Sequence, residues 1–118
     1  MAEAESVRTY GPALEKMYQF LLWLVPTVDK MPRSQKFTLG DRIQNTALGV
    51  LENLIEATYS KPAEPYLRQV NLELEKLRFL FRLASDLRLI DLRRYEHAAR
   101  AINEVGRLVG GWLKAKYA

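Results

Sequence analysis

Cationic side chains recur every seven residues near the C-terminal end of the sequence. They are Arg93, Arg100, Arg107 and Lys114. Seven residues make nearly two turns of an α-helix, so these side chains would project from one side with about 10 Å between neighbours. Arginine, which outnumbers lysine from Lys76 onward, binds phosphate through two parallel hydrogen bonds and also stacks on bases. The spacing and residue type therefore favour binding of a polyanion, with nucleic acid as the first candidate.

Further arginines extend this basic character to the preceding segment and to the flank of the series. We call the eight predicted contact residues the basic set: Arg78, Arg82, Arg88, Arg93, Arg94, Arg100, Arg107 and Lys114. Nothing in the sequence indicates reading of base edges, so we expect contacts mostly to phosphates. Glu96 and Glu104 are close enough along the helix to pair with Arg100 or Arg107. An ordinary solvated helix face is the alternative interpretation.

The charge is distributed unevenly along the chain. The 118-residue sequence has a formal net charge of +4 at pH 7, with six Lys/Arg and seven Asp/Glu in residues 1–60 but twelve and seven in residues 61–118. Such asymmetry is typical of a protein with an anionic partner. The N-terminal segment is acidic, and no apolar run approaches the roughly 20 residues of a membrane span. We expect a cytoplasmic protein that does not bind membranes.

The sequence lacks the residues that most enzyme and metal sites need. It contains no cysteine and one histidine, His97, and the residue three positions earlier is Arg94 rather than the glutamate of metal-binding helical bundles. No glycine-rich phosphate loop or nucleophile elbow occurs. We predict no catalytic residue, no metal site and no cofactor. An enzyme that uses His97 is kept as an alternative.

Apolar residues repeat in steps of three and four and predict four helices. The first begins near Pro12 and should kink or loosen at Pro26, because proline lacks a backbone N–H. The longest loop is expected over residues 31–37, followed by Thr38 as the cap of the second helix. The predicted buried positions of these two helices are Leu14, Met17, Leu21, Leu24, Val28, Ile43, Ala47, Val50, Leu54 and Ala57.

The third helix is predicted from about residue 65 to residue 90, and the fourth from Asp91 or Leu92. Their predicted buried positions are Leu67, Val70, Leu74, Leu77, Phe81, Ala84, Tyr95, Ala98, Ile102, Val105, Val109 and Trp112. The apolar face of helix three is widened by Leu80, Leu83 and Leu87 on one flank and by Phe79 on another. This width predicts either a second contact surface or a face covered by two neighbouring helices. Gly106 and Gly110 either allow the close approach of another backbone or loosen the last turns.

These elements predict an all-α protein, folded as an antiparallel up-down-up-down four-helix bundle, because the links between helices are short. We expect a single domain over residues 1–118, with residues 1–11 as a flexible N-terminal tail. A purely structural oligomer, whose charges only maintain solubility, is an alternative function for such a bundle.

Several motifs in combination resemble one protein family over about residues 18–114. They include Trp23-Leu24-Val25-Pro26, Phe37-Thr38-Leu39-Gly40-Asp41-Arg42-Ile43, Asp86-Leu87-Arg88 and Gly110-Gly111-Trp112-Leu113-Lys114. The chain is similar to the accessory variability determinant of diversity-generating retroelements. The four-helix proteins encoded by intervening sequences of ribosomal RNA genes share much of this pattern and are the alternative.

The resemblance implies a homopentameric ring of four-helix bundles with a positive surface. It also implies three partners: further copies of the chain, the reverse transcriptase of the element, and nucleic acid in the form of template RNA or its cDNA. The polymerase would do the chemistry of mutagenic cDNA synthesis. Arg78 and Arg82 match the basic pair of the family on helix three, and five copies would together carry a charge near +20.

Overall fold

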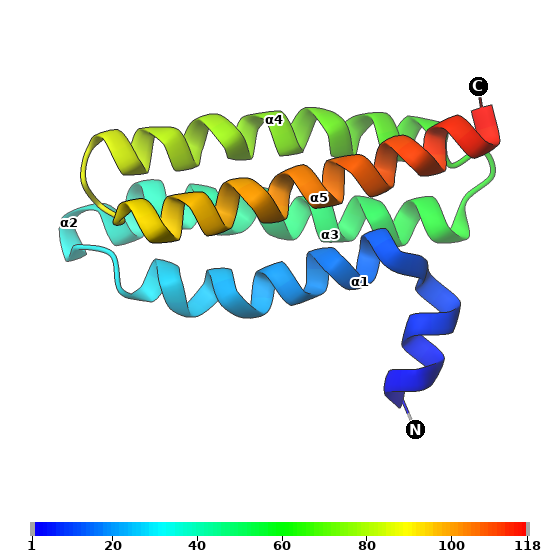
Figure 1. The fold of residues 1–118 in the computed structure, drawn as a ribbon, viewed down its shortest axis with the longest axis horizontal. Helices are drawn as coiled ribbons and strands as arrows, with labels where there is room; N and C mark the ends of the chain where they lie inside the picture. Colours follow the sequence, from blue (N-terminus) through cyan, green and yellow to red (C-terminus); the bar gives the residue numbers. More distant parts are fainter. Residues whose placement is uncertain (1, 118) are drawn as a thin grey trace.

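The structure, a computed structural model, describes the backbone of residues 2–117 and the side chains of residues 11–115. Within that range four long helices pack side by side and no strand occurs (Figure 1). They are α1 (Ala2–Asp29), α3 (Asp41–Tyr59), α4 (Glu64–Asp86) and α5 (Leu92–Tyr117). The short elements α2 (Arg33–Gln35) and η1 (Lys36–Gly40) connect α1 to α3. The predicted all-α class with four helices is confirmed.

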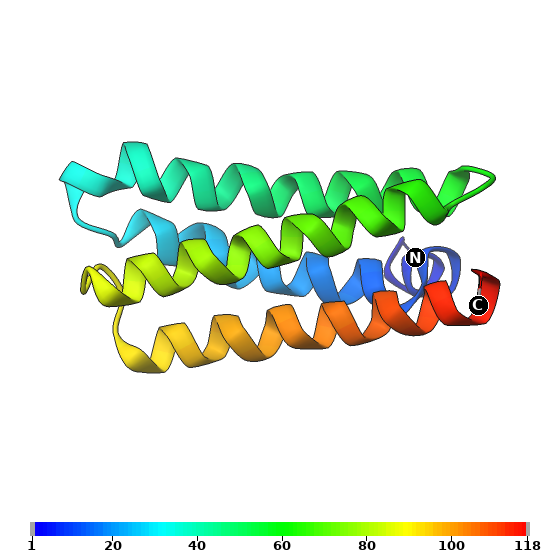
Figure 2. The ribbon, with the colours of Figure 1, turned by 90° about the horizontal axis from the view of Figure 1, so that it is seen from above.

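Each long helix lies beside two others. α3 contacts α1 and α4, and α5 contacts α4 and α1. Figure 1 shows the chain running along the long axis in α1, returning in α3, and reversing again in α4 and α5. Figure 2 shows α3 and α5 at opposite edges of the bundle. One side of α5 is therefore turned to solvent over most of its length.

The core consists of the apolar positions that the three-four periodicity predicts. Every predicted position in α1, α3 and α4 is buried, and so are the four central positions of α5. Tyr95 and Trp112, near the two ends of α5, are only half-buried. Full burial of a large aliphatic side chain stabilises a fold by about 1.5–3 kcal/mol. The core therefore fixes which face of each helix is exposed.

The break in α1 falls at Gly11 and not at Pro26. Gly11 has φ 77° and ψ 176°, outside the helical range, whereas the backbone angles stay helical through Pro26. Glycine adopts such a φ without the steric penalty of a side chain. The bundle portion of α1 consequently begins at Pro12, as predicted, and residues 2–10 turn away from the bundle (Figure 1). The predicted loosening at Pro26 is wrong.

The predicted loop over residues 31–37 is helical for most of its length. The backbone N–H of Lys36 donates to the carbonyl of Pro32, and that of Asp41 donates to the carbonyl of Thr38, so the chain enters α3 through continuous helical turns. Thr38 does not cap α3; its hydroxyl lies 3.3 Å from the carbonyl oxygen of Gln35. A side-chain cap is not needed, because backbone carbonyls already accept these N–H groups.

The third helix ends earlier than predicted, at Asp86, so Arg88 lies in a turn. Its φ is 60°, in the left-handed region. The N–H of Leu89 donates to the carbonyl of Ala84 at 2.8 Å and that of Arg88 to the carbonyl of Ser85 at 2.9 Å. This is the Schellman arrangement, which usually places glycine at the left-handed position. The prediction failed because no glycine marks this helix end.

Candidate nucleic-acid interface

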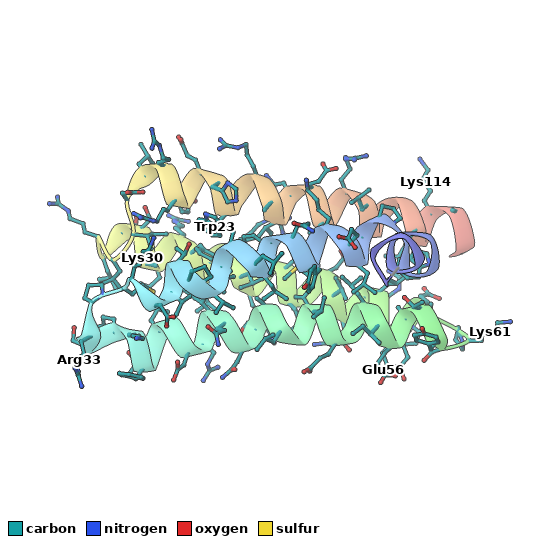
Figure 3. The ribbon with its side chains drawn as sticks, turned by 90° about the horizontal axis from the view of Figure 1, so that it is seen from below. Trp23, Lys30, Arg33, Glu56, Lys61 and Lys114 are labelled. Atoms are coloured by element: carbon teal, nitrogen blue, oxygen red, sulfur yellow. The ribbon has the colours of Figure 1, made fainter. Side chains whose placement is uncertain are left out.

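The four cations spaced by seven residues all lie on the exposed side of α5. The exposed residues are Arg93, Arg100, Arg107 and Lys114. The apolar residues on the other side of the helix are completely buried: Ala98, Ile102, Val105 and Val109. Figure 3 shows Lys114 projecting from α5 at one edge of the bundle and Glu56 projecting from α3 at the opposite edge. The burial of the apolar positions thus orients the cationic ones toward solvent.

Half of the basic set is paired with acids three or four residues away. Arg94 Nη1 lies 2.8 Å from Asp91, Arg78 Nη1 lies 2.9 Å from Glu75, and Arg82 Nε lies 3.9 Å from Asp86. Arg107 donates to both carboxylate oxygens of Glu104. Surface pairs of this kind contribute only about 0–1 kcal/mol each, so a phosphate can displace the acid at modest cost.

The other half has no acidic neighbour in ion-pair range among the described side chains. We call these four residues the unpaired cations: Arg88, Arg93, Arg100 and Lys114. All four are exposed. Three of them lie on α5 at the seven-residue spacing, and Arg88 lies in the turn just before that helix. An approaching phosphate would meet these charges without first displacing a carboxylate.

Glu104 and Arg107 shift each other's pKa through the hydrogen bonds between them. The hydrogen bond from Arg107 lowers the pKa of Glu104 below its ordinary value of 4.5. The same bond raises the pKa of Arg107 above its ordinary value. Both groups are therefore charged at neutral pH. Arg100 and Arg107 were the two predicted partners of Glu104, and the structure pairs Glu104 with Arg107. Arg100 is left unpaired.

Arg78 connects α4 to α5 in addition to its pairing with Glu75. Its Nε donates to Asn103 Oδ1 at 3.2 Å, and a Cβ placed on Gly106 would lie 3.3 Å from its Nη2. Gly106 therefore leaves room for the guanidinium. The atoms nearest to a Cβ at this position belong to the side chains of Arg78 and Leu74, so the predicted approach of another backbone is not seen among the described residues. Gly110 has only open space around it. Arg78 is half-buried, and so less available to a phosphate than its neighbour Arg82.

Arg88 lies at the rim of a hollow where α1 ends and α5 begins. The hollow has a volume of about 460 Å³, and Lys30 and Arg94 also line it. Asp91 lines it as well, and holds Arg94 in an ion pair. Lys30 was not part of the predicted set. No local pattern singles it out, because only the packing of α1 against the turn brings it to Arg88.

Of the four residues predicted to widen the apolar face of α4, Leu80 is partly buried against the core and the other three are exposed. Phe79 is 59% exposed, Leu87 is 53% exposed and Leu83 is 47% exposed. Leu72, also on α4, is 51% exposed. Of the two predicted interpretations of this face, coverage by two neighbouring helices does not hold for these residues.

His97, the best candidate for an alternative catalytic role, packs against an aromatic ring. Its ring centroid lies 4.4 Å from that of Trp23, and the side chain is exposed. Among the described residues, no group of three or more acidic and histidine side chains is placed to hold a metal ion. Over the same residues, no helix has the length and apolar character to cross a membrane.

Comparison with known families places the chain in one group. The model of the bAvd-like family matches residues 13–116, from the start of the bundle portion of α1 almost to the end of α5. Among curated proteins and solved structures, nothing matches the chain. The family match confirms the resemblance to accessory variability determinants, which are accessory, non-catalytic proteins. The chain therefore belongs to the bAvd-like family.

Proposed function

We propose that this protein is the accessory subunit of a diversity-generating retroelement and holds nucleic acid on the outer side of α5. The observation that carries the proposal is the group of unpaired cations, three of which lie on one exposed helix side. Membership of the bAvd-like family supports the accessory role. The chemistry of cDNA synthesis belongs to the polymerase in this proposal.

The proposed contacts are electrostatic and independent of base sequence. Each cation that neutralises a phosphate releases a bound counterion, so affinity should fall steeply as salt increases. The unpaired cations bind first because their charges are not compensated. Arg82 and Arg107, both exposed, contribute after exchanging a carboxylate for a phosphate. Template RNA is the proposed ligand, and its cDNA presents the same phosphates.

We further propose that copies of the chain assemble into a homopentameric ring that binds the reverse transcriptase of the element. The uncovered apolar side chains of α4 support self-association, since exposed apolar surface of this kind marks contact sites. A ring of five would repeat the basic side of α5 around its circumference. The net charge of +4 per chain would then act as a charge near +20.

Reconstituted reverse transcription tests the accessory role. The polymerase of the element and its template RNA are combined with this protein, with no addition, or with a variant in which Arg93, Arg100 and Lys114 are replaced by glutamine. We expect mutagenic cDNA only with the unaltered protein. Identical cDNA in all three reactions would contradict the proposal and favour the structural-oligomer alternative.

A further inference from the structure

A groove between α1 and α5 combines aromatic rings with cations. It has a volume of about 490 Å³, and its lining includes Trp23 and Phe20 from α1 and His97 from α5. Figure 3 shows Trp23 at the seam between these two helices. Lys16 lies on the α1 side of the groove and Arg100 on the α5 side. No pattern within either helix predicts the groove, because it depends on how the two helices are aligned.

The rings form a continuous aromatic wall. Phe20 stacks on Trp23 with ring centroids 5.8 Å apart and an interplanar angle of 15°. His97 lies on Trp23 at 4.4 Å and 35°. Phe20 is buried, Trp23 is half-buried and His97 is exposed. The wall therefore presents a partly apolar aromatic surface to solvent, and Ala101 lines the groove together with it.

The charges around this wall suit an anionic ligand. Lys16 and Arg100 are exposed and have no ion pair among the described side chains. The one acid lining the groove, Glu104, is held by two hydrogen bonds from Arg107, and Lys16 also lies close enough to stabilise its charge. The carboxylate is thus compensated, and the groove carries a net positive charge. A flat ring attached to phosphates satisfies both the wall and the cations.

We propose that the α1–α5 groove binds an unpaired nucleobase of a single strand, stacked on the Trp23–His97 wall, with its flanking phosphates at Lys16 and Arg100. This rests on the proposed function, because Arg100 belongs both to the groove and to the outer side of α5. Stacking accepts any base, since every base has a π-face, and it requires a base free of its duplex partner. The groove therefore gives the electrostatic surface a preference for single strands.

Fluorescence of Trp23 tests the groove directly. In a Trp112→Phe background, Trp23 is the remaining tryptophan of the chain. The probes are a single-stranded oligodeoxyadenylate of roughly 12 nucleotides, which lies within the site sizes of single-strand binders, and a strand of equal length and charge made of stable abasic units. We expect the oligodeoxyadenylate to quench Trp23 emission and to bind more tightly than the abasic strand, by about 5- to 100-fold.

Variants separate stacking from folding. His97→Ala and Arg100→Gln alter exposed side chains, so we expect circular dichroism to show an intact bundle. His97→Ala should lower the preference for the base-bearing strand, whereas Arg100→Gln should weaken binding of both strands. Phe37→Ala removes an exposed ring of η1 that does not line the groove and should leave the preference unchanged. Equal affinity for the two strands without quenching would overturn the groove while leaving the proposed function standing. If neither strand binds, the proposed function fails as well.

Discussion

At the residue scale, the acids of α4 and α5 decide which arginines of the basic set are available. Arg78, Arg82, Arg94 and Arg107 each have a carboxylate of their own helix within ion-pair distance. Arg88, Arg93, Arg100 and Lys114 do not. A bound phosphate must displace the acid from the first group but not from the second. Replacing one of these acids by a neutral residue should therefore release its arginine and raise the affinity for nucleic acid.

The pKa of Glu104 is the most direct measure of one such pair. The hydrogen bond from Arg107 lowers this pKa below 4.5. The pKa of Glu104 is thus lower in the folded state than in the unfolded state. The pair therefore stabilises the fold fully above a pH of about 4.5, and this contribution is lost as the pH falls through the folded-state pKa. In Arg107→Met, a carbon-13 NMR titration should show the Glu104 inflection moving up toward 4.5. An unchanged inflection would mean that Arg107 is not its partner in solution.

Asp91 combines a helix cap with an ion pair, and two substitutions separate these roles. Its Oδ1 accepts the backbone N–H of Arg94 at 2.8 Å, and its Oδ2 holds the Arg94 guanidinium at 2.8 Å. Asparagine also caps helices well, so Asp91→Asn should keep the free energy of unfolding and release Arg94. Asp91→Ala should release Arg94 too, but at a cost of about 1 kcal/mol of stability.

Urea unfolding measures the stability of both Asp91 variants, and fluorescence anisotropy with labelled RNA measures their affinity. Both variants should bind RNA more tightly than the unaltered protein, and only the alanine variant should be less stable. An alanine variant as stable as the unaltered protein would contradict the cap, and unchanged affinity in both would contradict the release of Arg94.

At the element scale, close packing of α4 on α5 depends on Gly106. The guanidinium of Arg78 occupies the space that a side chain at this position would take. Replacing a helical glycine by alanine stabilises a helix by up to about 1 kcal/mol. Gly110→Ala, where nothing lies within 4 Å, should show this gain. Gly106→Ala should gain less, because Arg78 must shift and weaken its bond to Asn103. Thermal unfolding of both variants measures the difference, and a larger gain at Gly106 would contradict the packing role.

The four helices and their buried sides were predictable because three-four periodicity follows from helix geometry alone. Helix ends were harder to predict. The turn after Asp86 has Arg88 at φ 60° where a sequence pattern would require glycine, and the helical segment before Asp41 has no amphipathic repeat to mark it. The break at Gly11 was missed because proline is the stronger sequence signal for a helix break, and the prediction was placed at Pro26. The helix accommodates this proline with helical backbone angles.

The candidate site was predictable in part, for a similar reason. The spacing of Arg93, Arg100 and Arg107 within one helix is enough to place them on one side of it. Their pairing depends on side-chain conformations, so the sequence left open whether Glu104 holds Arg100 or Arg107. The hollow with Lys30 and the groove with Trp23 require the alignment of two helices, which no local pattern determines.

At the scale of the whole molecule, the question is whether nucleic acid responds to the position of charge or only to its amount. Arg93, Arg100 and Lys114 lie on the exposed side of α5, whereas the equally exposed Arg33, Arg42 and Lys61 lie in α2, in α3 and just after α3. Figure 3 shows Arg33 and Lys61 at the two ends of the α3 edge of the bundle, with Lys114 at the opposite edge. Replacing either group by glutamine removes three positive charges from a chain of net charge +4.

The most direct test is the affinity for single-stranded RNA of these two triple glutamine variants, measured over a range of salt concentrations. If α5 holds the strand, its variant should lose about ten- to a hundredfold in affinity, and the slope of log affinity against log salt should become shallower by about 2. The variant altered at Arg33, Arg42 and Lys61 should match the unaltered protein. Equal losses in the two variants would show that net charge alone attracts the RNA, and would contradict an interface on α5.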